Sequence, residues 1–295
     1  MKEVKVKGLG IQVPDGSAFM YETPPNMFKA HQLGLINSPR GFGKTTLVCN
    51  ILKQMKYDKI IVISPSVKSN QNIMSMLNID EDDIYDDIDN PNVLEEVKAK
   101  IDNERDMLVE YRDKKEKYKK FLSKLNSQGE LIDDDLLLMF YNQGVFTPPT
   151  HWNGGKPPKI AVLFDDMIGS GIFTKGIRQL NAWVVKHRHQ SPFPEGGALG
   201  CSLFFLVQSY KAQNGGISKC IRNNTTLLCV GRTKSEKELQ DIAEECGAEV
   251  DTGTFMNLHK EATQDSKFDY LIIDFHKKDN HPSMFRKNLD TFLLP

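Results

Sequence analysis

A short glycine-rich segment contains the residue types that can hold a phosphate chain. Residues 38–46 read Ser-Pro-Arg-Gly-Phe-Gly-Lys-Thr-Thr and lie between an apolar run and a helix-like periodic segment. Glycines let a backbone turn tightly and bring several N–H groups onto phosphate oxygens, and a helix N-terminus adds partial positive charge. The segment therefore predicts a site for a nucleoside triphosphate and its metal ion.

Each residue of this segment has an expected role. Lys44 is expected to reach the β and γ phosphates as a point charge, and the Thr45 hydroxyl to ligate Mg²⁺. The usual pattern begins with glycine, whereas this chain has Ser38, a departure that touches none of the phosphate-contacting residues. The alternative is an ordinary glycine-rich turn with a chance lysine. The residues expected to surround the phosphates are Pro39, Arg40, Gly41, Phe42, Gly43, Lys44, Thr45 and Thr46.

Two adjacent carboxylates follow a strongly apolar run later in the chain. Residues 160–164 read Ile-Ala-Val-Leu-Phe and precede Asp165 and Asp166. Such a run predicts a buried parallel strand that delivers acids at its carboxyl end, where sites in open α/β sheets lie. We expect Asp165 to hold the Mg²⁺ shell and Asp166 to orient or deprotonate the attacking water. The alternative is that the pair only caps the turn after the strand.

Three further polar side chains are candidates for completing the site. Gln208 ends the apolar run 202–207, and we expect it to lie between the two loops above and to sense the γ-phosphate. Arg188 and Arg222 are candidates for neutralising charge on the transferred phosphoryl group, supplied to a neighbouring subunit. The alternative for each of the three is a solvated surface position.

The elements that must position these residues alternate between strands and helices. Apolar runs at 32–37 and 59–64 enclose a periodic segment at 44–56, which indicates strand, helix and strand. Further strands are expected at 160–164, 202–207, 225–230 and 270–275, and further helices at 174–188 and from the capping box at 235–238. The pattern predicts an α/β fold of the P-loop NTPase (ASCE, RecA-like) class, a three-layer sandwich with a mainly parallel central sheet.

A mostly helical insertion interrupts this pattern at about 67–157. Within it, residues 92–126 have apolar positions spaced by three and four, which predicts one long helix, with Glu104 and Lys115 where apolar groups are expected. The helix either packs on its own neighbour or on the core, or it forms a coiled coil with a partner. The chain thus divides into a strand-and-loop extension at 1–28 and an ATPase domain at 29–295 that contains the insertion.

Composition limits the partners and the compartment. The formal net charge is −1, so composition alone does not argue for nucleic acid, although a ring can confine basic residues to a central channel. The five cysteines show no CxxC pair and no zinc spacing, which predicts reduced thiols in a reducing compartment. No signal peptide is expected, and no apolar run approaches the ~20 residues that span a bilayer.

With these residues placed, the chain resembles the viral genome-packaging ATPases of the FtsK–HerA superfamily, in particular the poxvirus-type ATPases of large DNA viruses and virophages. The matching segments are 38–46, 160–167, 186–189, 203–210 and 221–226. The resemblance implies a core strand order of 5-1-4-3-2 and hydrolysis of ATP with Mg²⁺ by a homo-oligomeric ring, a pentamer or hexamer. Asp166 stands where many relatives carry glutamate, so water positioning has to compensate for one methylene.

The same resemblance implies partners and a location. The implied partners are double-stranded DNA and a viral capsid or portal vertex. The implied location is the host cytoplasm or viral factory, or association with the virion. A helicase or DNA-pumping ATPase of cellular type would use the same chemistry, and an assembly scaffold would bind nucleotide without turnover. Candidate DNA contacts are Lys175, Arg178 and Lys211, for which ordinary surface cations are the alternative.

Overall fold

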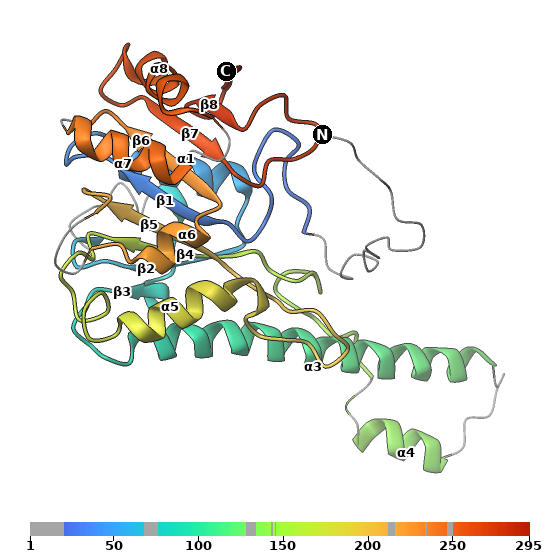
Figure 1. Ribbon diagram of the computed structural model, residues 1–295. Coiled ribbons are helices and arrows are strands. Elements are labelled where there is room, and N and C mark those ends of the chain that lie inside the picture. Colours follow the sequence, from blue (N-terminus) through green and yellow to red (C-terminus); the bar gives the residue numbers. More distant parts are fainter. Residues whose placement is uncertain are drawn as a thin grey trace, which may run out of the picture.

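The computed structural model describes residues 21–67, 76–127, 134–142, 144, 146–211, 216–233, 235–246 and 250–295 (Figure 1). Across these residues nine strands form one sheet, in the order β3-β2-β4-β5-β1-β6-β7-β8-β9. The strands are β1 (Leu33–Asn37), β2 (Lys59–Ile63), β3 (Ile84–Tyr85), β4 (Ile160–Asp165), β5 (Ser202–Val207), β6 (Leu227–Gly231), β7 (Tyr270–Asp274), β8 (Phe285–Lys287) and β9 (Thr291–Leu293).

The helices connect these strands across both faces of the sheet. They are α1 (Lys44–Met55), α3 (Val93–Ser127), α4 (Asp134–Asn142), α5 (Ile177–Lys186), α6 (Lys219–Asn224), α7 (Glu236–Cys246) and α8 (Thr252–Thr263). Two short 3₁₀ turns, η2 (Glu81–Asp83) and η3 (His187–His189), precede β3 and follow α5. Within the described ranges, no helix combines the length and the apolar character that a membrane crossing requires.

The central strands confirm the expected order. Strands β2, β4, β5, β1 and β6 pair in parallel, and counted along the chain as strands 2, 3, 4, 1 and 5 they give the order 5-1-4-3-2. The C-terminal strands β7, β8 and β9 extend the sheet in antiparallel pairs. Strands of three residues, such as β8 and β9, are too short for a periodic sequence signal, which is why the sequence did not predict them.

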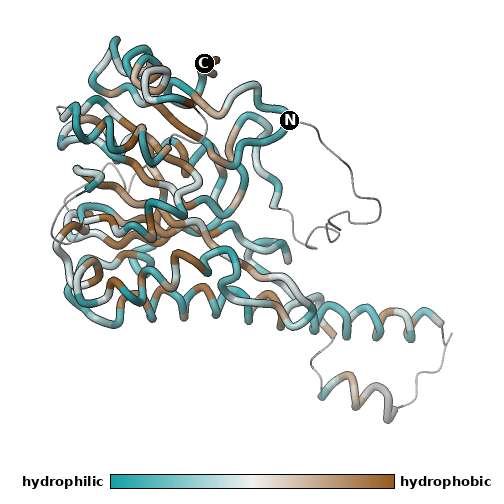
Figure 2. The backbone as a smooth tube through the Cα atoms, in the orientation of Figure 1, coloured by the Kyte–Doolittle hydropathy of each residue, from teal (hydrophilic) through white to brown (hydrophobic). Residues whose placement is uncertain are grey.

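Alternating side chains of the strands fill two separate apolar layers. On one face, Ile36 and Leu206 belong to a cluster that α1 covers. On the other face, Leu35 and Phe205 belong to a cluster that receives side chains from α3, α5, α7 and α8. The tube in Figure 2 is brown along the central strands and mixed along the helices. The three-layer sandwich predicted from the sequence is therefore confirmed.

The insertion contains a strand as well as helices. Strand β3 pairs in parallel with β2, matching Val62 with Ile84 and Ile63 with Tyr85, and extends the sheet at that edge. The sequence predicted that the sheet resumes only at 160, because a pair of apolar residues within the acidic run 80–89 has no detectable period. The expected helix at 174–188 is α5 followed by η3, and it begins at Ile177 after a turn.

Helix α3 explains why a glutamate interrupts its apolar series. Val97, Ile101 and Leu108 are fully buried against the core, and Glu104 lies among them with 4% of its surface exposed. Its carboxylate is 3.0 Å from Lys59 Nζ on β2 and accepts a hydrogen bond of 2.9 Å from Trp152 Nε1. A buried carboxylate is stable only with such partners, so Glu104 ties the insertion to the sheet.

The far part of α3 runs beyond the sheet, with α4 beside it (Figure 1). There Phe121 and Phe140 pack with ring centroids 4.9 Å apart. Leu122 and Leu125 of the same part are 36% and 40% exposed. Of the two alternatives for this helix, the described residues show packing within the chain: on the core over its first half, and on α4 beyond.

Candidate nucleotide-binding site

The loop between β1 and α1 has the backbone geometry of an anion cradle. Gly41 and Gly43 both have φ of 81°, a left-handed conformation that favours glycine. Gly43 is the N-cap of α1, where no side chain among the described residues caps the helix and no acidic residue occupies the first turn. The first N–H groups of α1 therefore remain available to a ligand. In α8, by contrast, the Asp251 side chain caps the start of the helix. The loop fits a phosphate group.

Lys44 opens α1 and turns back over the loop. Its Nζ donates hydrogen bonds to the carbonyl oxygens of Ser38, at 2.7 Å, and Pro39, at 3.1 Å. Burial lowers the pKa of Lys44, while the charges of Asp165 and Asp166 raise it. The phosphate loop follows parallel β1 and the two aspartates stand at the end of parallel β4, which lie on either side of β5, so the ammonium and both carboxylates belong to one edge of the sheet. A triphosphate would offer stronger acceptors than the two carbonyls.

Asp165 is the last residue of β4 and is only 7% exposed. Burial, followed by the charge of Asp166, raises its pKa to about 6, against the opposing effects of Lys44 and of the Asp166 backbone N–H. A buried carboxylate with a raised pKa gains from a nearby cation. Thr45 lies in the first turn of α1, directly after Lys44. Hydroxyl and carboxylate oxygens are ligand types that Mg²⁺ accepts in proteins.

Asp166 and Gln208 meet at the carboxyl edge of the sheet. Strands β4 and β5 pair in parallel with Asp165 opposite Leu206, so the residues that follow both strands are neighbours. The Gln208 Nε2 donates a hydrogen bond of 3.1 Å to Asp166 Oδ1, and both side chains are exposed. Asp166 has φ of 55°, a conformation that aspartate tolerates better than most residues. The Asp166 carboxylate therefore faces the residue that follows the neighbouring strand, so it does more than cap the turn after its own strand.

Ser38, the departure from the usual glycine, has a partner far away in the sequence. Its Oγ lies 2.8 Å from the hydroxyl oxygen of Tyr270, and that hydroxyl donates a bond of 2.9 Å to the carbonyl oxygen of Phe42. Because a phenol has one proton, Ser38 is then the donor to Tyr270. A β-carbon on Gly231 would come within 2.7 Å of Ser38 Cβ, so glycine makes room for the serine. Buried Tyr270 therefore links both ends of the phosphate loop.

Replacing Tyr270 with phenylalanine should weaken nucleotide binding by up to roughly 30-fold, because two hydrogen bonds worth about 1 kcal/mol each would no longer fix the loop. The ring would remain to fill the core. Titration calorimetry with a non-hydrolysable ATP analogue measures the effect. Tyr57→Phe is the matched control, since it removes a buried hydroxyl bonded to Ser202 instead. Equal affinities for the Tyr270 variant and the unaltered protein would contradict the anchoring role.

The two candidate arginines lie in different environments. The Arg222 guanidinium packs 5.4 Å from the Tyr210 ring centroid and donates from Nε to Glu245 Oε2 at 3.0 Å, so its charge is already compensated. Arg188 is exposed in η3, which leads into the amino end of β5, whereas Gln208 follows the carboxyl end. Arg188 therefore does not reach the phosphate loop of its own chain.

The candidate DNA contacts also differ. Lys175 and Arg178 are exposed around the start of α5. Lys211 instead forms ion pairs with Asp241 at 3.1 Å and with Glu245 at 3.2 Å. Long-range pairs of this kind are invisible to sequence reasoning, because helix α7 supplies both carboxylates from about thirty residues downstream.

The strand order, the phosphate loop between β1 and α1, and the acid-bearing β4 define a P-loop NTPase fold. No family model matches the sequence, and no curated protein matches it. Among solved structures, the chain is similar to the genome packaging NTPase B204 of Sulfolobus turreted icosahedral virus 2, solved with sulfate. The TM-score is 0.46 and the identity 12%, over 89% of this chain and 97% of that one.

Two further similar structures belong to longer chains. The conjugation coupling protein TcpA of pCW3 gives a TM-score of 0.41 and 14% identity, over 90% of this chain and 62% of that one. The cytoplasmic domain of the type VII secretion ATPase EccC of Thermomonospora curvata gives 0.38 and 13%, over 83% and 24%. The chain thus spans less than two thirds of either. Because all three TM-scores lie below 0.5, the proposals that follow rest on this chain's own residues.

Proposed function

We propose that this chain is an ATPase that moves double-stranded DNA into a preformed viral capsid as a homo-oligomeric ring. The observation that carries the ATPase part is the convergence at one sheet edge of Lys44, Asp165, Asp166 and Gln208. The motif series in chain order, from 38–46 to 221–226, supports the packaging part through its resemblance to viral packaging ATPases.

The residues divide the work of hydrolysis. Lys44 and the N–H groups of the phosphate loop bind and orient ATP, and Thr45 and Asp165 are the oxygen donors for Mg²⁺. Mg²⁺, when bound, neutralises the charge that develops on the phosphate oxygens. Asp166 accepts the proton of the attacking water, and the Gln208 amide holds its carboxylate. Because a hydrogen bond already joins the two side chains, a change at the γ-phosphate can pass from one strand end to the other.

The arrangement of the arginines favours Arg188 over Arg222 as the residue supplied to a neighbouring subunit. An arginine that acts in a neighbouring subunit's site needs a guanidinium that is free to move from solvent onto the phosphate. Arg222 would first have to break its bonds to Glu245 and to the Ile217 carbonyl, whereas Arg188 is exposed. The nucleotide site of the same subunit lies at the opposite edge of the sheet from Arg188. In a ring, Arg188 could instead complete the nucleotide site of a neighbouring subunit.

The test is ATP hydrolysis with and without duplex DNA, combined with displacement of a triplex-forming strand from the duplex. DNA-stimulated hydrolysis that displaces the third strand without unwinding the duplex would support translocation. Unwinding of a tailed duplex would favour a helicase, and ATP binding without turnover would favour a scaffold. Charge reversal of Lys175 and Arg178 should reduce the salt-dependent binding of DNA, with exposed Lys120 of α3 as the control.

Negative-stain images with a non-hydrolysable ATP analogue test the assembly. A closed ring with a central hole is expected, and a protein that stays monomeric with nucleotide and DNA would contradict the ring and the role of Arg188 together.

A further inference from the structure

An exposed aromatic ring lies directly against the phosphate loop. Phe268 is 55% exposed, although large apolar side chains normally prefer burial. A β-carbon placed on Gly43 would lie 3.1 Å from Phe268 Cδ1, so one edge of the ring touches the residue just before Lys44. The Lys267 ammonium sits 4.9 Å from the centroid of the same ring. The rest of the ring remains open to solvent beside the loop that fits phosphate.

The sheet order decides which end of a nucleotide would come to this ring. Asp165, Asp166 and Gln208 follow β4 and β5, which lie on one side of β1. The γ-phosphate and metal therefore belong on that side. Strands β6 and β7 lie on the other side, and the segment that leads into β7 carries Phe268 at the same edge as the end of β6. A triphosphate bound across the loop has to extend its sugar and base toward β6 and β7.

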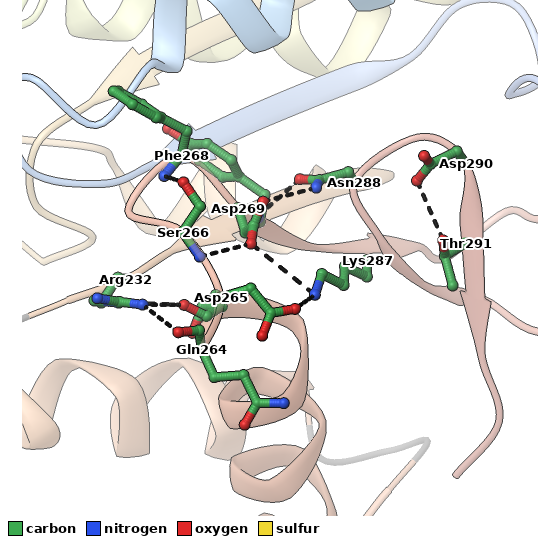
Figure 3. Close-up of polar contacts among 12 residues, drawn as sticks. Arg232, Gln264, Asp265, Ser266, Phe268, Asp269, Lys287, Asn288, Asp290 and Thr291 are labelled. Carbon is green, nitrogen blue, oxygen red and sulfur yellow. Dashed lines mark hydrogen bonds and ion pairs between the residues drawn. The ribbon is translucent and has the colours of Figure 1, made fainter.

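The segment that carries Phe268 is firmly held. The Ser266 N–H donates to Asp269 Oδ2 at 2.9 Å, and the Asn288 side chain donates to Asp269 Oδ1 at 3.0 Å. Lys287 pairs with Asp265. Figure 3 shows these contacts, with the Phe268 ring projecting away from the Asp265–Lys287 pair. A ring on a fixed segment loses little freedom when a ligand stacks on it, which favours binding.

We propose that Phe268 is the platform on which the purine base of ATP stacks. The inference rests on the proposed ATPase function and adds the subsite for the base. Stacking on an aromatic ring uses the face of a purine, and every base offers such a face. Stacking also gives exposed Phe268 an apolar partner whenever nucleotide is bound.

The experiment compares two ligands that share a triphosphate and differ in the base. Phe268→Ala should weaken the binding of Mg²⁺-ATP roughly 5- to 150-fold, the range of base–aromatic stacking. Binding of Mg²⁺-tripolyphosphate, measured by competition with ATP, should stay unchanged. Phe268→Trp should restore ATP affinity, and ATP but not tripolyphosphate should quench the fluorescence that this tryptophan adds. Tyr141→Ala, which removes an aromatic ring that is 71% exposed on α4, is the control and should alter neither ligand.

The outcomes separate this inference from the function on which it rests. Unchanged ATP affinity in Phe268→Ala, with ATP binding still lost in Lys44→Ala, would overturn the base platform alone. Equal losses for ATP and tripolyphosphate would make Phe268 a support of the loop and would also overturn the platform. Failure of the unaltered protein to bind either ligand would overturn the proposed function, and the platform with it.

Discussion

Replacing Lys44 with alanine is expected to abolish measurable ATP hydrolysis. Lys44 opens α1 with its ammonium within electrostatic range of Asp165 and Asp166, and the ammonium already bonds the carbonyls of its own loop. Without it, the outer phosphates would lose the cation that their own subunit's phosphate loop supplies as charge builds up there. A loss of at least roughly 100- to 1,000-fold in turnover follows from removing one such electrostatic contact. Steady-state phosphate release measures it.

The matched control is Lys53→Ala, which removes an exposed lysine from the last turn of the same helix. Its turnover should remain close to that of the unaltered protein. Thermal unfolding of both variants checks that the loss comes from the site, since removing the partly buried ammonium of Lys44 is not expected to unfold the core. Normal hydrolysis by the Lys44 variant would show that the nucleotide site lies elsewhere.

The sequence predicted the strands that have a clear apolar pattern and the polar residues that stand at the ends of those strands. Strand β5 was expected at 202–207 and is Ser202–Val207, because a near-continuous apolar run of this length is typical of a central parallel strand that is buried on both faces. Asp166 and Gln208 were expected near one another because parallel strands end at one edge, and a hydrogen bond joins them. Local pattern and sheet geometry were sufficient for both.

Contacts between distant segments could not be predicted in the same way. Nothing near Ser38 in sequence indicates Tyr270, and nothing near Gly43 indicates Phe268, because antiparallel β7 brings both to the loop from the far end of the chain. The serine in place of the usual glycine marked a departure from the pattern, but it did not identify its partner. Arg222 was an arginine of open role until the fold brought Glu245 to it.

The capping box at the start of α7 illustrates a local motif with a long-range use. The Glu238 N–H donates to Ser235 Oγ at 3.2 Å, as expected from the sequence. The Glu238 carboxylate, however, accepts hydrogen bonds from the Tyr210 N–H at 2.5 Å and from the Thr233 hydroxyl at 3.1 Å. Glu238 thereby fixes the chain two residues after Gln208, so the first turn of α7 helps to position the γ-phosphate side of the site. The predicted Gly247 stop lies outside the described residues.

Replacing Asp166 with asparagine is expected to stop turnover while leaving nucleotide binding within a few-fold of normal. The amide cannot accept a proton from water, and loss of a general base costs roughly 100- to 10,000-fold. The Asn Oδ1 can still accept the bond from Gln208, and asparagine tolerates the φ of 55° at this position. The variant should therefore fold normally and bind ATP through Lys44 and the loop. Single-turnover hydrolysis together with calorimetric binding separates the two effects.

Two comparisons define what Asp166 does. Asp279→Asn, at an exposed aspartate between β7 and β8, should leave turnover unchanged. Asp166→Glu retains the carboxylate but moves it one methylene further from the backbone. The activity that this variant keeps shows how strongly positioning of the attacking water depends on the length of the side chain. Turnover by Asp166→Asn equal to that of the unaltered protein would assign the water to another group. The Asp166–Gln208 contact would then link two strand ends without a direct part in hydrolysis, and the search for the base would move to Asp165, the other carboxylate coupled to Lys44.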